Sequence, residues 1–382
     1  MMQMVHSRFN ALLSACVMSL IATAGWSQSL TWLGVLPNGG WSSAYGVSAD
    51  GAVVVGLAYN AAGYGRAFRW TASGGMQDLG TLGSNQSFAY GVSANGAVVV
   101  GWATNAAGQY RAFRWENGIM QDLGTLPSGG NSWATDVSAD GSVVVGEADN
   151  AAGQRRAFRW TELGGMQPLG TLGGDLSVAN AVSANGAVVV GWSYDDARRQ
   201  RAFRWENGVM QDLGTLGGRE SGAHAVSADG SVVVGSAQDA AGLGQTFRWQ
   251  NGVMQALGTL PGTDYSVASG VSADGSVVVG SAQDAAGGKR AFRWTASGGM
   301  EDLNTTYASL LTDGSYLYRA TAISPDGRYI VGSGYNAATN RTEAFLLDTR
   351  PRCTLDGDVN GDGVVDDADL LIVLFNFGNR CP

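Results

Sequence analysis

The hydrophobic pattern repeats along most of the chain at intervals of about 45 residues. In each unit a valine-rich run follows the string V-S-A-[DN]-G, and an A-F-R-W string comes later in the same unit. The serine of the first string occurs seven times, at Ser48, Ser93, Ser138, Ser183, Ser227, Ser272 and Ser324. A period of this length predicts a solenoid, an array or a propeller.

Each unit contains four short strand candidates separated by turn signals. In the second unit they cover residues 88–93, 98–103, 111–115 and 120–123. Asn95-Gly96 separates the first two candidates and Asn117-Gly118 separates the last two, and Asn-Gly favours a two-residue hairpin turn. Each unit is therefore predicted to be a four-stranded antiparallel meander.

The distribution of the fourth strand distinguishes a closed ring from a linear solenoid. A fourth-strand string of the M-Q-D-L-G type follows A-F-R-W in six units but is missing after Phe345. A similar segment, Leu30-Thr31-Trp32-Leu33-Gly34, stands before the first complete unit, where it can complete the last blade and cover both sheet edges. We therefore expect an all-β, seven-bladed β-propeller over residues 30–349, closed by an N-terminal strand.

One unit carries a resemblance to a known family. The sequence from Leu169 to Trp205 reads L-G-T-L-G-G, then V-S-A-N-G-A-V-V-V-G, then A-F-R-W. It resembles the HAF-type extracellular repeat of bacterial surface and secreted proteins, with Arg201 where that family often has the His of H-A-F. The resemblance implies export and a repeat fold, and it implies no particular reaction.

The N-terminus and the net charge indicate where the protein acts and which partners are excluded. Residues 1–24 have a sparsely basic start, an apolar stretch and a final Ala-Thr-Ala, which predicts a secretory signal peptide. The alternatives are a membrane anchor, for which the run is shorter than the roughly 20 residues required, and a lipoprotein box at Cys16. We expect a secreted or cell-surface protein without a membrane span in the mature chain. The net charge of −9 disfavours nucleic acid as a partner.

The last 30 residues differ in character from the repeats. Cys353 and Cys381 bracket residues 353–382 of a chain predicted to be exported, which favours a disulfide, and two free thiols are the alternative. Between them the oxygen ligands follow the spacing of an EF-hand loop, with Gly363 at its sharp turn. The predicted Ca²⁺ ligands are Asp358, Asn360, Asp362, the Val364 carbonyl, Asp366 and Asp369. An acidic turn without metal is the other interpretation.

The calcium loop and the apolar stretch after it resemble one half of a type I dockerin. Dockerins ordinarily carry two such segments and dock to cohesins in polysaccharide-degrading assemblies, whereas one segment is present here. The resemblance implies a calcium-dependent docking or anchoring segment, with a cohesin-like or cell-surface partner.

The repeats offer little that points to catalysis. The chain has two histidines, and His6 lies in the predicted signal, while the Asp of each S-A-D-G string is interpreted as a hairpin turn. We therefore predict no catalytic residues and expect a non-enzymatic binding or scaffold propeller, with polysaccharide as the leading ligand class because of the dockerin-like tail. A polysaccharide-active glycoside hydrolase and a purely structural cell-surface protein are the alternatives.

One variable position within the copied units is the candidate for ligand binding. On the predicted innermost strand an invariant alanine precedes a residue that differs between units, which indicates either a water-filled channel under relaxed selection or adaptation to a ligand. We expect the ligand to contact this ring and the loops above it, on the face opposite the Asn-Gly turns. The ring consists of Tyr45, Tyr90, Thr135, Asn180, His224, Ser269 and Thr321.

Overall fold

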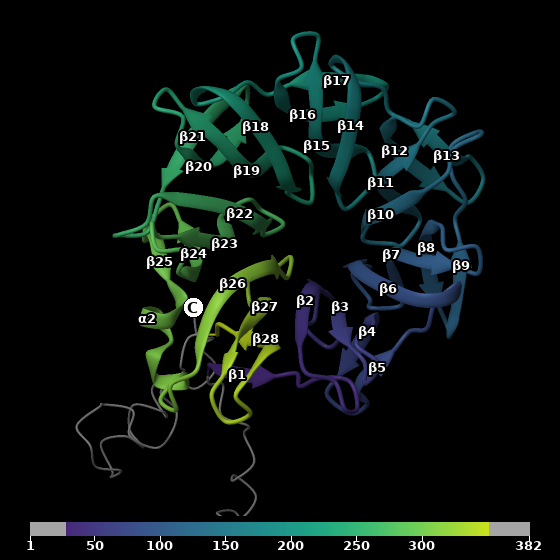
Figure 1. The fold of residues 1–382 in the computed structure, drawn as a ribbon. Helices are drawn as coiled ribbons and strands as arrows, with labels where there is room; N and C mark the ends of the chain where they lie inside the picture. The colour runs from purple at the N-terminus through teal and green to yellow at the C-terminus, as the bar shows by residue number, and fades with distance from the viewer. Residues whose placement is uncertain (1–27, 351–382) are drawn as a thin grey trace, which may run out of the picture. The chain divides into compact units, whose positions relative to one another are not determined.

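Seven four-stranded antiparallel sheets follow one another around a common centre (Figure 1). This computed structural model describes residues 28–350, within which Leu30–Asp348 form one unit. The prediction of an all-β, seven-bladed propeller is confirmed. The predicted signal peptide, the cysteines and the calcium loop lie outside the described residues.

The blades use consecutive strands. The first four blades contain β2 (Ser42–Val47), β3 (Val54–Tyr59), β4 (Gly65–Thr71) and β5 (Gly75–Asp78); β6 (Gly83–Val92), β7 (Val98–Asn105), β8 (Tyr110–Glu116) and β9 (Ile119–Asp122); β10 (Ser132–Val137), β11 (Val143–Asp149), β12 (Arg155–Thr161) and β13 (Gly165–Pro168); and β14 (Gly173–Val182), β15 (Val188–Asp195), β16 (Gln200–Glu206) and β17 (Val209–Asp212). The remaining strands are β18 (Gly217–Val226), β19 (Val232–Asp239), β20 (Gly244–Gln250) and β21 (Val253–Gly258); β22 (Tyr265–Val271), β23 (Val277–Gln283), β24 (Lys289–Thr295) and β25 (Gly299–Asp302); and β26 (Tyr316–Ile323), β27 (Tyr329–Asn336), β28 (Arg341–Asp348) and β1 (Ser29–Trp32). The order in the seventh sheet is β1-β28-β27-β26.

The centre of each blade is a glycine paired with a phenylalanine. Gly56, which ends the first valine run, lies opposite Phe68 of the first A-F-R-W string, and Phe68 is fully buried. A Cβ on Gly56 would lie 2.1 Å from the Ser43 carbonyl oxygen and 2.8 Å from the Phe68 ring. The glycine is therefore required by close packing, which explains why V-V-V-G and A-F-R-W recur together.

The two kinds of Asn-Gly turn differ. Asn117 and Gly118 both have positive φ and connect β8 to β9, as predicted for a two-residue hairpin. The Asn95-Gly96 prediction is wrong in this respect, because the connection runs from Ser93 to Ala97 and Gly96, but not Asn95, has positive φ. Ser93 closes this longer turn, since its Oγ accepts the Val98 N–H at 2.9 Å and donates to Asn95 Oδ1 at 2.8 Å.

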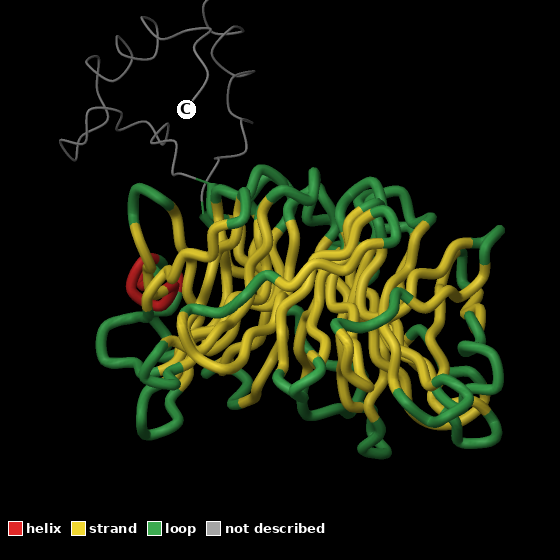
Figure 2. The backbone as a smooth tube through the Cα atoms, turned by 90° about the horizontal axis from the view of Figure 1, so that it is seen from above, coloured by secondary structure: helices red, strands yellow, loops and turns green. Residues whose placement is uncertain are grey.

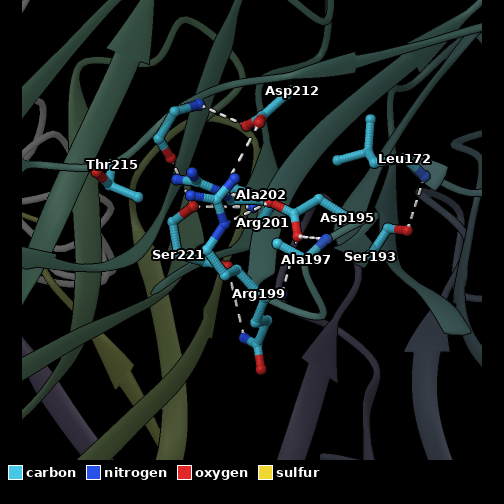
Figure 3. A network of polar contacts seen from close by, with 12 residues as sticks. Leu172, Ser193, Asp195, Ala197, Arg199, Arg201, Ala202, Asp212, Thr215 and Ser221 are labelled. Carbon is cyan, nitrogen blue, oxygen red and sulfur yellow. Dashed lines mark hydrogen bonds and ion pairs between the residues drawn. The ribbon is translucent and has the colours of Figure 1, made fainter. Parts of the chain in front are cut away.

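Serine side chains tie neighbouring blades together. The Ser221 Oγ accepts the Ala202 N–H from the preceding blade at 2.9 Å and donates to the Gly214 carbonyl at 2.6 Å (Figure 3). We call this arrangement the serine tie, and it recurs at Ser42, Ser87, Ser132, Ser177 and Ser266. At the junction between the sixth and seventh blades, Asn304 instead exchanges two hydrogen bonds with the Leu317 backbone.

Hydrogen bonds within the outer loops hold them in place. In the fourth blade Asp195 accepts hydrogen bonds from the Arg199 backbone N–H and from the Arg199 guanidinium, and these bonds lower the Asp195 pKa to about 2 (Figure 3). The Arg201 guanidinium lies 3.4 Å from the same carboxylate. The long insertion between the sixth and seventh blades contains a helical turn, α2 (Leu303–Thr306), and the 3₁₀ segment η1 (Ala308–Leu310). Loops cover both faces of the ring of strands (Figure 2).

Candidate functional site

The seven variable residues lie at one structural position, which is a β-bulge on the innermost strand of each blade. In the first blade Ala44 pairs with Gly56 and Gly46 pairs with Val55, so Tyr45 is the extra residue between them. The same shift occurs around Tyr90, Thr135, Asn180, His224, Ser269 and Thr321. Bulges re-aim a side chain, and all seven residues line one central cavity of about 220 Å³.

The residue after each bulge is small, with one exception. This position is Gly or Ala in six blades and Asp136 in the third. A Cβ on Gly91 would lie 3.0 Å from the Asp136 Cα, so the inner strands approach each other closely here. Among the described residues that line the cavity, Asp136 supplies the one carboxylate.

Burial dominates the chemistry of Asp136. Its two carboxylate oxygens accept the N–H groups of Val137 at 2.8 Å and of Val182 in the next blade at 2.9 Å. Removal from water raises the Asp136 pKa to about 6, although both hydrogen bonds oppose this change. The carboxyl group therefore changes charge near pH 6.

Four ring residues connect one blade to the next. Each donates a hydrogen bond to the carbonyl of the invariant alanine in the following blade. The pairs are Thr135 with Ala179 at 2.9 Å, Asn180 with Ala223 at 2.7 Å, His224 Nδ1 with Ala268 at 2.9 Å and Thr321 with Ala44 at 2.7 Å. These side chains therefore stabilise the ring, a role that the sequence interpretation did not include.

The protonation of His224 follows from its contact. Because a carbonyl oxygen only accepts, the Nδ1 atom must carry the proton. Burial lowers the His224 pKa below its usual value, so the imidazole is neutral at pH 7 and its Nε2 atom is an acceptor.

The two ring tyrosines contact each other and extend into a larger group of aromatic residues. The Tyr45 and Tyr90 ring centroids are 5.4 Å apart, and Tyr90 lies 6.5 Å from Phe88. Phe88 stacks on Trp102 at 4.2 Å, and Trp102 meets Tyr110 edge-on at 5.1 Å. Tyr110 in turn stacks at 5.6 Å on Trp133 of the third blade.

We call these six residues the aromatic crescent. They come from the bulges and from the strand ends near the loops between β7 and β8 and between β9 and β10, which is the face opposite the Asn117-Gly118 turn. Tyr110 is 37% exposed, and the other five side chains are half-buried. The Arg155 guanidinium lies 4.6 Å above the Trp133 ring and ends the row with a cation–π contact.

The repeated tryptophans of A-F-R-W serve the core. Trp160 and Trp249 are buried, and Trp70, Trp115, Trp205 and Trp294 pack against the clusters between blades. The sequence interpretation missed Phe88, Trp102, Tyr110 and Trp133, because each is variable between blades and sits among ordinary strand residues.

No family model matches the chain, and no curated protein matches it. Among solved structures, the β-propeller domain of the Trilobed protease from Pyrococcus furiosus is similar at 10% identity, over 81% of this chain and 96% of that one, with a TM-score of 0.53. TolB from Acinetobacter baumannii matches at 11% identity over 80% of this chain, which spans 65% of that protein, with a TM-score of 0.46. A putative TolB from Agrobacterium tumefaciens matches at 16% identity, over 82% of this chain and 91% of that one, with a TM-score of 0.45.

The first of these likenesses supports the propeller fold and nothing finer. Within residues 28–350, no helix is long and apolar enough to cross a membrane.

Proposed function

We propose that this protein is an exported binding propeller that holds a polysaccharide chain on the aromatic crescent, two of whose residues line the central cavity. The observation that carries the proposal is the unbroken row of ring contacts from Tyr45 in the first blade to Trp133 in the third. The C–H face of a pyranose is apolar and packs on aromatic faces, while its hydroxyls need polar partners nearby. The polar cavity beside the crescent supplies such partners.

The crescent also argues for one extended ligand on each molecule. Seven identical sites would require the same side chains in all seven blades, whereas the six residues of the crescent come from the first three blades. The uniform parts of the units build the blade cores and the serine ties, which accounts for the copied framework without a repeated binding function.

The proposal predicts that Tyr45→Ala combined with Tyr90→Ala weakens retention on an immobilised polysaccharide by tenfold or more, an expected loss of about 1.4 kcal/mol or above. Thermal stability should change little, because neither phenol takes part in the hydrogen bonds between ring residues and alanine carbonyls. Affinity electrophoresis on a panel of glycans measures retention. Tyr64→Ala, an exposed tyrosine outside the crescent, is the control.

Other outcomes of this panel separate the alternatives. Retention that survives the double substitution but is lost in Asn117→Ala places the ligand on the opposite face. Release of reducing ends indicates a glycoside hydrolase instead of a binding protein. The absence of retention on every glycan favours a structural cell-surface protein.

We further propose that residues 353–382 bind one Ca²⁺ and dock the propeller to a cohesin-like or cell-surface partner. The spacing of the six oxygen ligands supports this assignment, as does the resemblance to half a dockerin. The HAF-type resemblance of the repeats and the signal-like N-terminus support export in the same way.

The calcium proposal predicts that Asp358→Ala with Asp362→Ala abolishes calcium binding by the full chain, since two of the charged ligands are removed. The unfolding transition of the propeller should be unchanged, because the propeller has its own core. Titration calorimetry with Ca²⁺ measures the binding. Asp356→Ala with Asp367→Ala removes the same charge outside the ligand set, and calcium heat that is equal in both double variants contradicts the assignment.

We also propose that β1 closes the ring by acting as the fourth strand of the seventh blade. Its place beside β28 supports this role, and so does the hydrogen bond of 2.9 Å from the Leu33 N–H to the Ala344 carbonyl. The Ser42 Oγ makes a serine tie to the Ala344 N–H at 2.8 Å, so this junction repeats the bonds found between blades that are consecutive in the chain.

A further inference from the structure

The fifth blade has small residues at three positions where the second blade carries aromatic side chains. Gly222, Ser236 and Gly244 correspond in the repeat to Phe88, Trp102 and Tyr110 of the crescent. In the third and fourth blades the same positions carry larger residues, such as Trp133 and Trp192. A pocket of about 310 Å³ occupies this space between the fourth, fifth and sixth blades. We call it the fifth-blade pocket.

Polar groups and one aromatic ring line the pocket. Gln200 from the fourth blade, Glu220 and Gln238 from the fifth and Tyr265 from the sixth form its walls. The Tyr265 ring rests on Gly244, where a Cβ would lie 2.3 Å from the ring, so the glycine fixes the position of this wall. Tyr265 is nevertheless 43% exposed, which leaves part of the ring accessible.

A hydrogen-bond donor and a hydrogen-bond acceptor both lie near Gly222. The Cβ position of Gly222 is 3.1 Å from Gln200 Nε2 and 3.6 Å from His224 Nε2. The Gln200 amide nitrogen is a donor, whereas His224 Nε2 is an acceptor because Nδ1 donates to Ala268. Gly222 lines the pocket, and His224 lines the central cavity next to it, so both nitrogen atoms lie near one point at Gly222. The Gln200 amide also donates to the Ser221 carbonyl at 3.5 Å. A donor and an acceptor near one point suit a hydroxyl group, which donates and accepts at once.

We propose that the fifth-blade pocket is a subsite for a single neutral pyranose unit. A sugar hydroxyl bridges His224 Nε2 and the Gln200 amide, other hydroxyls reach Glu220 and Gln238, and the apolar sugar face lies against Tyr265. The inference rests on the proposed function and extends it, since the unit belongs to the same glycan that the crescent holds. An anionic or purely apolar ligand fits the mixture of amides, one carboxylate and a neutral imidazole less well.

The pocket can be filled with side chains that other blades carry at the same repeat positions. Gly222→Val copies the fourth and sixth blades, which have Val178 and Val267 here, and Ser236→Trp copies the second blade. Both substitutions fill the pocket with residues that the fold already accepts. The control is Ser281→Trp, the same repeat position in the sixth blade and outside the pocket lining.

Nuclear magnetic resonance of His224 gives a direct readout, because the chain has two histidines and the other is His6. Glucose, galactose, mannose, xylose and N-acetylglucosamine are titrated separately into the ¹⁵N-histidine-labelled protein. We expect one of them to shift the His224 Nε2 resonance, with affinity reduced about tenfold or more in Gly222→Val and Ser236→Trp and retained in Ser281→Trp.

Two results overturn the subsite. One is the absence of a His224 shift with every sugar, and the other is a shift that persists unchanged in both filled variants. If polysaccharide is still retained through Tyr45 and Tyr90 in either case, the subsite fails while the proposed function stands. If the wild-type protein retains no polysaccharide, the proposed function itself fails.

Discussion

Raising the pH from 4 to 7 is expected to lower the unfolding free energy of the wild-type protein by about 2 kcal/mol relative to an Asp136→Ala variant. The Asp136 pKa is about 6 in the folded protein and near 3.8 in the unfolded chain. Between these values the folded state holds the proton that the unfolded state has lost, so stability falls as the pH rises through this window. The contribution is largest below pH 4 and is lost above pH 6.

Urea unfolding at pH 4, 5, 6 and 7 measures this difference, and alanine is a residue that the fold already uses at this position in Ala181 and Ala225. Asp140 is the control, because a hydrogen bond from Ser138 and one from the Ser142 backbone hold its pKa below the usual value. Its replacement by alanine should leave the two profiles nearly parallel from pH 5 to 7, and the opposite sign appears only below pH 3.8, where wild-type stability is lost as Asp140 takes up a proton. Stability profiles of wild type and Asp136→Ala that run parallel contradict the assignment.

The blade architecture could be predicted because it depends on contacts between residues close in sequence. The valine run, the A-F-R-W string and Asn117-Gly118 specify three neighbouring strands and their turn within one unit. Each unit forms one sheet whose faces must be covered by neighbouring sheets, so seven units predict seven blades packed in a ring.

The bulge could have been found from the sequence as well. In a regular strand, residues on one face are separated by an even number of positions, yet Ala134 and Val137 pack in the same cluster. The odd separation requires one extra residue between them, and Thr135 and Asp136 share that interval. In each unit, the odd spacing between the invariant alanine and the valine or isoleucine before the repeat serine therefore indicates the bulge.

The crescent and the fifth-blade pocket could not be predicted in the same way. Trp102 and Trp133 belong to different blades, and their joint contact with Tyr110 depends on how the blades are inclined to each other. The hydrogen bond from His224 to Ala268 likewise crosses a blade junction. Such contacts arise from packing between units, whereas the repeat pattern describes the inside of a unit.

Leu33→Ala is expected to destabilise the protein as much as Leu123→Ala, by about 3 kcal/mol in each case. The two leucines hold equivalent positions, since Leu33 is 5% exposed between the seventh and first blades and Leu123 is 7% exposed between the second and third. Each N–H donates at 2.9 Å to the alanine of the neighbouring A-F string, Ala344 or Ala112. If β1 closes the ring, removing either side chain leaves the same kind of cavity in the same kind of junction.

Denaturant unfolding of both variants measures the comparison, and the double variant should lose the sum of the two effects because the sites are far apart in the ring. A closed ring also requires one cooperative transition in all of these proteins, since the seventh blade is then fastened on both sides. If β1 does not close the ring, the two leucine variants should differ in stability. In that case Leu33→Ala costs less than about 0.5 kcal/mol, as exposed substitutions do, while Leu123→Ala keeps its full cost, and this result would rule out closure by the N-terminal strand.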